Sequence, residues 1–278
     1  MVLPNIAVIY LFHESEQFHV LERFVKSYKS KDAGIKHKLL LALKGDNFSD
    51  FFLQNLLTLG TIFDDIIYLK DEGFDIYSYQ LLGKFLYFKT FFFMNSHCEI
   101  NSNNWLAHCF TALNKNQVAL VGCTGSYQSI YSDLIQNYSM HYTNIGYKNF
   151  TINKVRTRLY RSWFPKFSNP HVRTNAFMIR RSDFLNLTFP FFKNRKISAL
   201  RFESGYDSIT RQILKTNHHV VVAGSDGVAY AIDCWMESRT YFFADQSNLL
   251  VSDNRTRVYD DASNEMKLCL SRKIWGLF

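Results

Sequence analysis

Short apolar runs and amphipathic segments take turns along the first half of the chain. The runs at 6–12 and 38–43 are almost continuously apolar, which is typical of strands buried on both faces of a parallel sheet. Segment 16–30 spaces its apolar residues at helical intervals, with charged residues between them. The same alternation predicts further strands at 65–69, 90–94 and 118–121, and helices at 51–59, 77–88 and 105–113.

This order of elements predicts an α/β fold of stacked right-handed βαβ units: a Rossmann-like, mostly parallel central sheet flanked by helices. After an irregular, basic and aromatic middle, the pattern predicts a strand at 174–179, a helix at 208–215 and a last buried strand at 220–223. With 4 Pro and 12 Gly in 278 residues, the chain has no Pro/Gly/Ser-rich linker. We therefore expect a single domain over 1–278.

Polar residues follow the first, third and fourth predicted strands. Open parallel sheets bind ligands beyond the carboxyl ends of their strands, which singles out the loops 13–16, 71–79 and 95–99. A structural histidine and an acidic helix cap are the alternatives for the residues of the first two loops. We expect one crevice formed by His13, Asp75, Asn95, Ser96, His97 and Glu99.

The net charge of +8 is concentrated in the middle of the chain. Between Lys148 and Arg201 there are thirteen Lys or Arg residues and one acid, Asp183. Such a stretch indicates an anionic partner, and a nucleic acid, an anionic membrane surface and a nucleoside diphosphate all fit the charge. A solvated basic face is the other interpretation.

The cysteines and the apolar runs exclude several protein classes. The chain has 5 Cys, an odd and scattered number without a CxxC pair, which argues against a disulfide framework and structural zinc. The apolar run at the start is too short for a membrane span, and no cleavage signal follows it, so we expect a cytoplasmic protein. No G-x-G-x-x-G follows the first strand, which disfavours a dinucleotide-dependent redox enzyme.

Several segments, in the same order along nearly the whole chain, resemble those of bacterial GT-A-like glycosyltransferases, including relatives of rhamnan-synthesis proteins. The resemblance implies transfer of a sugar from a nucleotide-sugar donor to a saccharide acceptor, which lipid can carry, in capsule or O-antigen (lipopolysaccharide) biosynthesis. It implies a donor half at 1–125, and an acceptor half with a C-terminal tail at 126–278. The segments are DEGFDIYSY (71–79), MNSHCEI (94–100), VGCTGSY (121–127), NPHVRTNAFMIRR (169–181), FESGYDSITRQIL (202–214) and SNLLVSDNRTR (247–257).

One departure from the family concerns the metal. GT-A enzymes typically end the fourth strand with Asp-x-Asp, which holds a divalent ion on the donor's diphosphate. Here the stretch is Asn95-Ser96-His97, so His97 and Glu99 are the candidate ligands for Mn²⁺ or Mg²⁺. Metal independence is the alternative, in which Lys or Arg residues of the basic middle neutralise the diphosphate.

An inverting glycosyltransferase needs a carboxylate that takes the proton of the attacking hydroxyl. The candidates are Glu203, expected just ahead of the helix at 208–215, and Asp207, for which capping that helix is the alternative. His171, Arg173 and Asn175 alternate along an extended segment and are expected to share one face, which binds phosphate or acceptor or is the outer face of an edge strand. Further candidates for acceptor or phosphate binding are Arg211, Asp226 and Trp235.

The tail and the missing Asp-x-Asp leave two questions open. Residues 266–278 mix apolar and basic residues, which suits either peripheral contact with an anionic membrane or a helix packed on the domain. The missing carboxylates raise an alternative function, an inactive GT-A-like protein that binds carbohydrate or acts as a scaffold. No nucleic-acid-binding motif is present, so we expect no nucleic-acid partner.

Overall fold

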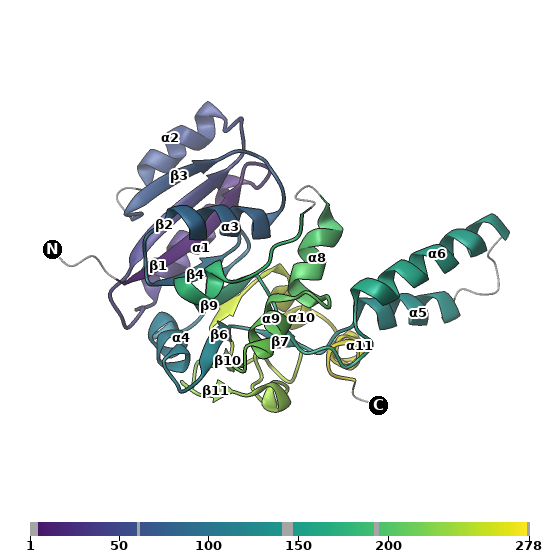
Figure 1. The fold of residues 1–278 in the computed structure, drawn as a ribbon. Helices are drawn as coiled ribbons and strands as arrows, with labels where there is room; N and C mark the ends of the chain where they lie inside the picture. Colours follow the sequence, from purple (N-terminus) through teal and green to yellow (C-terminus); the bar gives the residue numbers. More distant parts are fainter. Residues whose placement is uncertain (1–4, 60–61, 141–146, 192–194, 277–278) are drawn as a thin grey trace.

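An eight-stranded sheet, in the order β11-β10-β6-β9-β4-β1-β2-β3, forms the centre of the protein (Figure 1). The computed structural model describes residues 5–59, 62–140, 147–191 and 195–276. The strands of this sheet are β1 (Ile6–His13), β2 (Lys38–Lys44), β3 (Asp65–Leu69), β4 (Thr90–Met94), β6 (Val118–Gly122), β9 (Ala176–Arg180), β10 (His219–Ala223) and β11 (Ala229–Tyr230).

The sheet is mostly parallel. Strand β1 pairs in parallel with β2 and β4, β2 with β3, and β6 with β10. Strand β9 runs antiparallel between β4 and β6, and β11 is antiparallel at the edge. The predicted α/β class with a mostly parallel central sheet flanked by helices is therefore confirmed, although the sequence pattern did not predict the reversal of β9.

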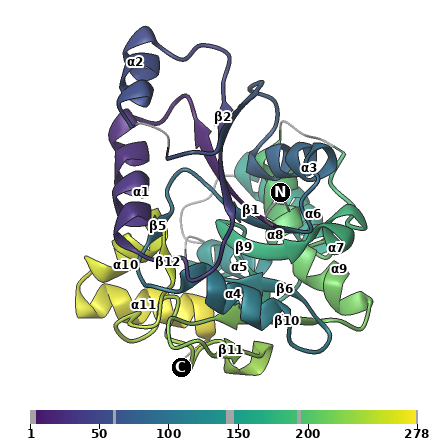
Figure 2. The same ribbon diagram turned by 90° about the vertical axis from the view of Figure 1, so that its left-hand side faces the viewer.

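Helices cover both faces of the sheet (Figure 2). Along β1, Val8, Tyr10 and Phe12 point into one apolar cluster, while Ile9 and its other alternate neighbours point into a second cluster. This double burial explains the continuous apolar run. The first cluster packs against α1 (Phe18–Ser30), α2 (Asp50–Thr58) and α4 (Trp105–Leu113), and the second against α3 (Asp75–Phe85), α7 (Arg181–Leu185), α8 (Lys196–Ser204), α9 (Ile209–Lys215), α10 (Asn254–Asp260) and α11 (Asn264–Trp275).

The basic middle of the chain is helical, so the predicted irregular structure is wrong there. Helices α5 (Ile130–Met140) and α6 (Tyr147–Trp163) form a hairpin that projects from the body of the protein (Figure 1). Arg158 and Arg161 of α6 are exposed. Helices α8 and α10 were not predicted from the sequence either.

The smaller elements join distant parts of the chain. Strand β5 (Glu99–Ile100), just after the end of β4, pairs with β12 (Val251–Ser252). Strand β7 (Gly125–Ser126) pairs with β8 (His171–Val172), and a 3₁₀ turn covers Ile232–Cys234. These pairings bring the segment after β12 close to the carboxyl end of β4.

The C-terminal helix α11 packs against the domain with part of its surface. Ile274 and Trp275 are buried, and the Trp275 Nε1–H donates to the Tyr241 carbonyl at 3.0 Å. Met266 and Leu268 stay about half exposed, and residues 277–278 of the predicted tail lie outside the described residues. Where the chain is described, no helix is both long and apolar enough to cross a membrane. Contact of the tail with a membrane stays a prediction.

Candidate functional site

A polar cleft of about 480 Å³ lies at the carboxyl ends of β1, β2, β3 and β4. It joins the three loops that the sequence singled out, because the parallel strands β3-β2-β1-β4 are direct neighbours and end at the same edge. Five predicted residues line this cleft together: His13, Asp75, Asn95, Ser96 and His97. It is also lined by Ser15, Glu16, Lys44, Asp71, Gly73 and Phe74.

His13, the last residue of β1, is held by two side chains of the cleft. Its Nε2 lies 3.0 Å from Asp71 Oδ1 and its Nδ1 lies 2.8 Å from Ser15 Oγ. The Ser15 N–H also donates to Nδ1, at 3.1 Å, so Nδ1 accepts and Nε2 donates to the carboxylate. The hydrogen bond from His13 lowers the pKa of Asp71. The imidazole is therefore fixed in one orientation, facing the cleft.

Asp75 is the first residue of α3, and it does not cap that helix. The N-cap position is Phe74, and no side chain makes a capping hydrogen bond there. Burial raises the pKa of Asp75, while Lys44, His13 and His97 and the Asn95 amide act in the opposite direction. A carboxylate that is half-buried without a capping role is available to ligand hydroxyls.

The loop after β4 is held rigidly. The Asn95 N–H donates to the Asn175 carbonyl at 3.0 Å, and Asn95 Oδ1 accepts from the His97 N–H at 3.3 Å. Ser96 Oγ donates to the Leu11 carbonyl at 3.0 Å and accepts from the His13 N–H at 3.2 Å. Ser96 therefore links the ends of β1 and β4, and the imidazole of His97 is the more accessible group.

Glu99 does not line the cleft with the other predicted donor-site residues. Its Oε2 lies 3.6 Å from Arg23 Nε and 3.4 Å from Arg257 NH1, whereas His97 Nε2 lies 3.5 Å from Glu16 Oε1. The two predicted metal ligands thus have different partners. Among the residues that the structure describes, no three His, Cys, Asp or Glu side chains gather in a way that could hold a metal ion.

The sequence pattern did not indicate Lys44, a positively charged residue that lines the cleft beside the carboxylates of Asp71 and Asp75. It ends β2 opposite His13, its side chain is 3% exposed, and its Nζ donates to the Gly73 carbonyl and lies 3.6 Å from Asp71 Oδ1. The available signal was a lysine that closes an otherwise apolar strand. The polar loops after the first, third and fourth strands do not include this position, which lies at the end of the second strand.

The two predicted catalytic carboxylates lie outside the cleft and in different surroundings. Glu203 belongs to the last turn of α8, and it accepts from the Thr174 N–H at 2.9 Å and the Thr174 hydroxyl at 2.6 Å. Asp207 is exposed, pairs with Arg201 at 2.6 Å, and lines a separate pocket of about 570 Å³. Ser208, not Asp207, caps α9.

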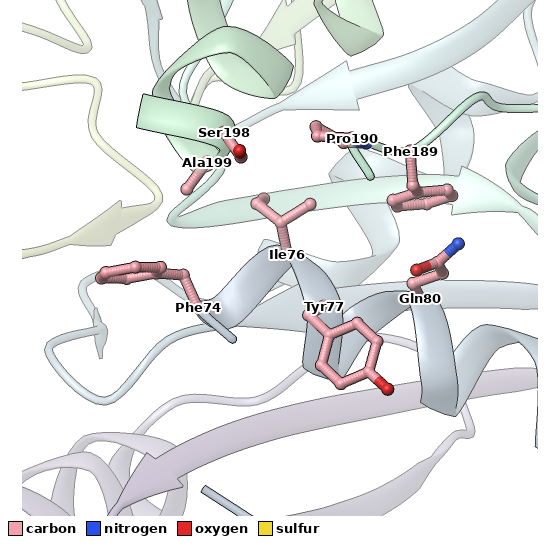
Figure 3. Close-up of a pocket in the computed structure, with 8 residues that line it drawn as sticks. All are labelled: Phe74, Ile76, Tyr77, Gln80, Phe189, Pro190, Ser198 and Ala199. Carbon is pink, nitrogen blue, oxygen red and sulfur yellow. The ribbon is translucent and has the colours of Figure 1, made fainter. Parts of the chain in front are cut away.

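Glu203 belongs to a helix that packs against α3, the helix that begins with the cleft residue Asp75. Burial raises the pKa of the Tyr79 hydroxyl on α3, and the charges of Asp75 and Glu203 raise it further. An apolar slot joins α3 to α8, with Phe74 facing Ala199 (Figure 3). Glu203 follows Ala199 by one helical turn and so projects from the same side of α8. Phe74 lines both this slot and the cleft.

The alternating residues of the second half are largely buried, so the edge-strand interpretation is wrong for them. Arg173 forms a buried ion pair with Asp253 at 2.6 Å and lies over the Tyr241 ring at 4.2 Å. His171 is buried, with Nδ1 2.7 Å from the Asn169 carbonyl, and Asn175 accepts from the Thr124 hydroxyl at 3.3 Å. The Arg211 guanidinium donates to Asn169 Oδ1 at 3.2 Å. Their side chains form a network behind the cleft.

The structure does not bring Asp226 and Trp235 to the cleft. Asp226 lies in the turn between β10 and β11, where it accepts from the Val228 N–H at 2.9 Å and the Tyr230 hydroxyl at 2.6 Å. The predicted role of Trp235 in acceptor binding, in which its ring would stack on a sugar, is wrong, because Trp235 is 0% exposed and its Nε1–H donates to the Tyr230 carbonyl. Its indole ring packs closely on Gly125, where there is no room for a Cβ atom.

The fold and this cleft define the class of protein: an α/β protein with a mostly parallel central sheet and a polar cleft at the carboxyl ends of its parallel strands. No protein-family model and no curated protein matches the sequence. A solved structure with a similar fold is the mannosyltransferase PcManGT from Pyrobaculum calidifontis in complex with GDP-Man and Mn²⁺, at 10% identity and a TM-score of 0.48. The match covers 86% of this chain and 60% of that chain, so this chain spans less than two thirds of the length of that structure.

Two further solved structures are similar. The inositol-1-phosphate CTP transferase from T. maritima has 11% identity and a TM-score of 0.45, with 98% of this chain and 96% of that chain covered. S. aureus TarS 1-349 in complex with UDP-GlcNAc has 15% identity and a TM-score of 0.34, over 42% of this chain and 33% of that chain. At these TM-scores the likenesses carry no weight for activity or ligand, which have to be argued from the residues of the chain.

Proposed function

We propose that the chain is a nucleotide-sugar-dependent glycosyltransferase of bacterial surface-polysaccharide biosynthesis, with the donor bound in the cleft of His13, Asp75, Asn95 and His97. The observation that carries this proposal is the convergence of the three strand-end loops in one cleft of about 480 Å³. That volume suits a small polar ligand. The order of the family-like segments along the sequence supports the same class.

The polar groups of the cleft match the chemistry of such a donor. Asp75 is a carboxylate acceptor for ribose or sugar hydroxyls, and the His97 imidazole can donate to them or accept from them. Phe74 is 38% exposed at the cleft wall and offers an aromatic face to a ring of the ligand. Since the described residues hold no three-ligand metal group, we derive no step through a metal ion.

We assign the proton-accepting step to Glu203. In an inverting transfer, the acceptor hydroxyl oxygen bonds to the anomeric carbon as the bond from that carbon to the diphosphate breaks, and the hydroxyl proton passes to a carboxylate. Glu203 is supported by its position on the α3-facing side of α8. Its present partner, the Thr174 hydroxyl, is a group that an acceptor hydroxyl can replace. Asp207 lies in a different pocket and is the weaker candidate.

Nucleotide binding tests the proposal directly. The melting temperature is measured with UDP, GDP, CDP and dTDP, and hydrolysis of matching nucleotide sugars is followed. We expect one nucleotide to raise the melting temperature of the wild-type chain. We also expect Glu203→Gln to keep that shift but lose about 10²- to 10⁴-fold in turnover. Asp261→Asn, an exposed carboxylate on α10's C-terminal side, is the matched control.

Each outcome separates the candidate functions. Stabilisation by none of the nucleotides would count against a donor site in the cleft. Stabilisation without turnover by the wild-type chain would favour the alternative, an inactive carbohydrate-binding or scaffold protein. Full turnover by Glu203→Gln would remove Glu203 from the mechanism and leave the donor site standing.

A further inference from the structure

The cleft interior holds more carboxylates than fixed cations. Glu16, Asp71 and Asp75 line it, and Lys44 is the only Lys or Arg among its lining residues in the described part of the chain. The Lys44 ammonium group is already shared between the Gly73 carbonyl and Asp71. A nucleotide sugar brings a diphosphate of at least two negative charges, so cations from outside this interior have to balance it.

The basic middle of the sequence is not in position to provide those cations. Its α6 segment lies on the projecting hairpin (Figure 1), and none of the described residues between 155 and 201 is among those that line the cleft. Arg173 comes from the same stretch, but its guanidinium is paired with the buried carboxylate of Asp253 at 2.6 Å. The predicted source of charge neutralisation is therefore wrong in position.

A surplus of positive charge lies directly behind His97. Arg23 of α1 and Arg257 of α10 share the single carboxylate of Glu99, at 3.6 and 3.4 Å. Asp253, the other carboxylate that acts on Arg257, is already paired with Arg173, so three arginines face two carboxylates and one positive charge is left over. Arg257 NH2 also donates to the His97 carbonyl at 3.2 Å, which ties the arginine pair to the cleft.

The two guanidinium groups are close enough to repel each other. Burial and the charge of Arg23 both lower the pKa of Arg257, while Glu99 raises it. Both side chains are partly exposed, at 35% for Arg23 and 27% for Arg257, so neither is sealed in the protein interior. The repulsion between two like charges at a partly exposed position is offset when an anion binds beside them.

We propose that Arg23 and Arg257 form the subsite that holds the diphosphate of the donor at the His97 end of the cleft. Glu99 balances part of their positive charge and does not contact the donor. A planar guanidinium with parallel N–H groups matches phosphate oxygens in a bidentate manner, which a compact ammonium group cannot do. This inference rests on the proposed function, since it names the part of the donor that this side of the site recognises.

Isothermal titration with the best nucleoside diphosphate and with its parent nucleoside tests the subsite. Arg257→Gln is expected to weaken binding of the nucleoside diphosphate about tenfold or more, because a charge-assisted hydrogen bond is lost. Its affinity for the nucleoside is expected to stay unchanged. Arg257→Lys is expected to recover only part of the affinity, and Arg23→Gln to weaken it less than Arg257→Gln, since Arg23 makes no contact with His97.

Two further variants distinguish a phosphate contact from damage to the fold. Arg255→Gln removes the same charge from an exposed position on α10 and is expected to leave the affinity unchanged. Glu99→Gln removes the counter-charge and is expected to tighten binding of the nucleoside diphosphate severalfold, with a steeper dependence on salt. A purely structural role of Glu99 predicts weaker binding instead.

The results separate this inference from the proposed function. Equal affinities of Arg257→Gln and the wild type for the nucleoside diphosphate would overturn the subsite and leave the donor site intact. A parallel loss of affinity for the nucleoside and its diphosphate would also overturn it, because the effect would then not be specific to phosphate. Failure of the wild type to bind any nucleotide would instead contradict the proposed function.

Discussion

Polar residues in the two halves of the chain occupy different environments. In the first half, His13, Asp75 and His97 follow parallel strands and line an open cleft. In the second half, Arg173 and Asp253 make a buried ion pair behind that cleft. A polar residue at the end of a parallel strand is placed at the binding edge by topology, whereas a polar residue on an irregular connection is placed by its partners. The first half should therefore tolerate substitutions that the second half does not.

The largest loss of stability is expected for Asp253→Ala. This change leaves the Arg173 guanidinium buried without its counter-charge and removes the capping box at the start of α10. Breaking a buried pair costs about 3–5 kcal/mol in the free energy of unfolding. Urea denaturation measures this loss, with Asp261→Asn as the exposed control. A loss below about 1 kcal/mol would contradict the prediction, because that is the contribution expected of a solvent-exposed ion pair.

Trp235→Ala is expected to lower the free energy of unfolding by about 3–5 kcal/mol, a loss similar to that of Asp253→Ala, because it opens a cavity against Gly125. Trp235→Phe should lower the free energy of unfolding by less. The same denaturation curves measure both. If Trp235 stacked on a sugar ring instead, Trp235→Ala would fold normally and lose only ligand affinity, and the contrast between the halves would fail at this position.

His97→Ala tests the opposite behaviour in the first half. Its side chain is 31% exposed and makes one 3.5 Å contact with Glu16, so the free energy of unfolding should change by less than about 0.5 kcal/mol. Donor affinity is expected to fall about tenfold, the size of one lost hydrogen bond to a charged group. Calorimetry gives the affinity, with His19→Ala, at an exposed position of α1, as the control.

Asp75→Asn should give a smaller effect that depends on pH. Burial raises the pKa of Asp75 in the folded chain, so the folded state binds this proton more tightly than the unfolded state. The contribution of Asp75 to stability is therefore full below the unfolded pKa and is lost as pH rises through the folded pKa. We expect Asp75→Asn to melt higher than the wild type at pH 7 and the difference to disappear at acid pH, while donor affinity falls.

A lower melting temperature of Asp75→Asn at pH 7 would show that the carboxylate stabilises the fold. Higher stability with lower affinity is the combination expected of a residue kept for binding. Comparison of melting curves at several pH values, with and without nucleotide, distinguishes the two cases.

Much of the sheet was predictable because its strands are apolar on both faces. The pattern located β3 and β4 at their observed bounds, and β1 and β2 within one residue. The cleft followed from topology alone. The topology did not indicate Lys44, because its role depends on Asp71 and Gly73, which the loop after β3 brings next to it.

The second half was predicted less well for a physical reason. Alternation at His171, Arg173 and Asn175 predicted one extended segment with a shared face, but β8 ends at Val172 and a turn covers residues 174–175. Periodicity also does not tell whether a face meets solvent or a buried partner. Asp253, the partner of Arg173, is 80 residues away in the sequence. Trp235 was misjudged for the same reason, since its contact with Gly125 exists only in the folded chain.

A crystal structure of the chain with the nucleoside diphosphate that stabilises it most tests the central claim most directly. The account predicts the nucleotide in the cleft, in contact with Asp75 and His97, with its diphosphate toward Arg257. A nucleotide bound instead in the pocket beside Asp207 and His218, with the cleft of His13 and Asp75 left free of ligand, would contradict it.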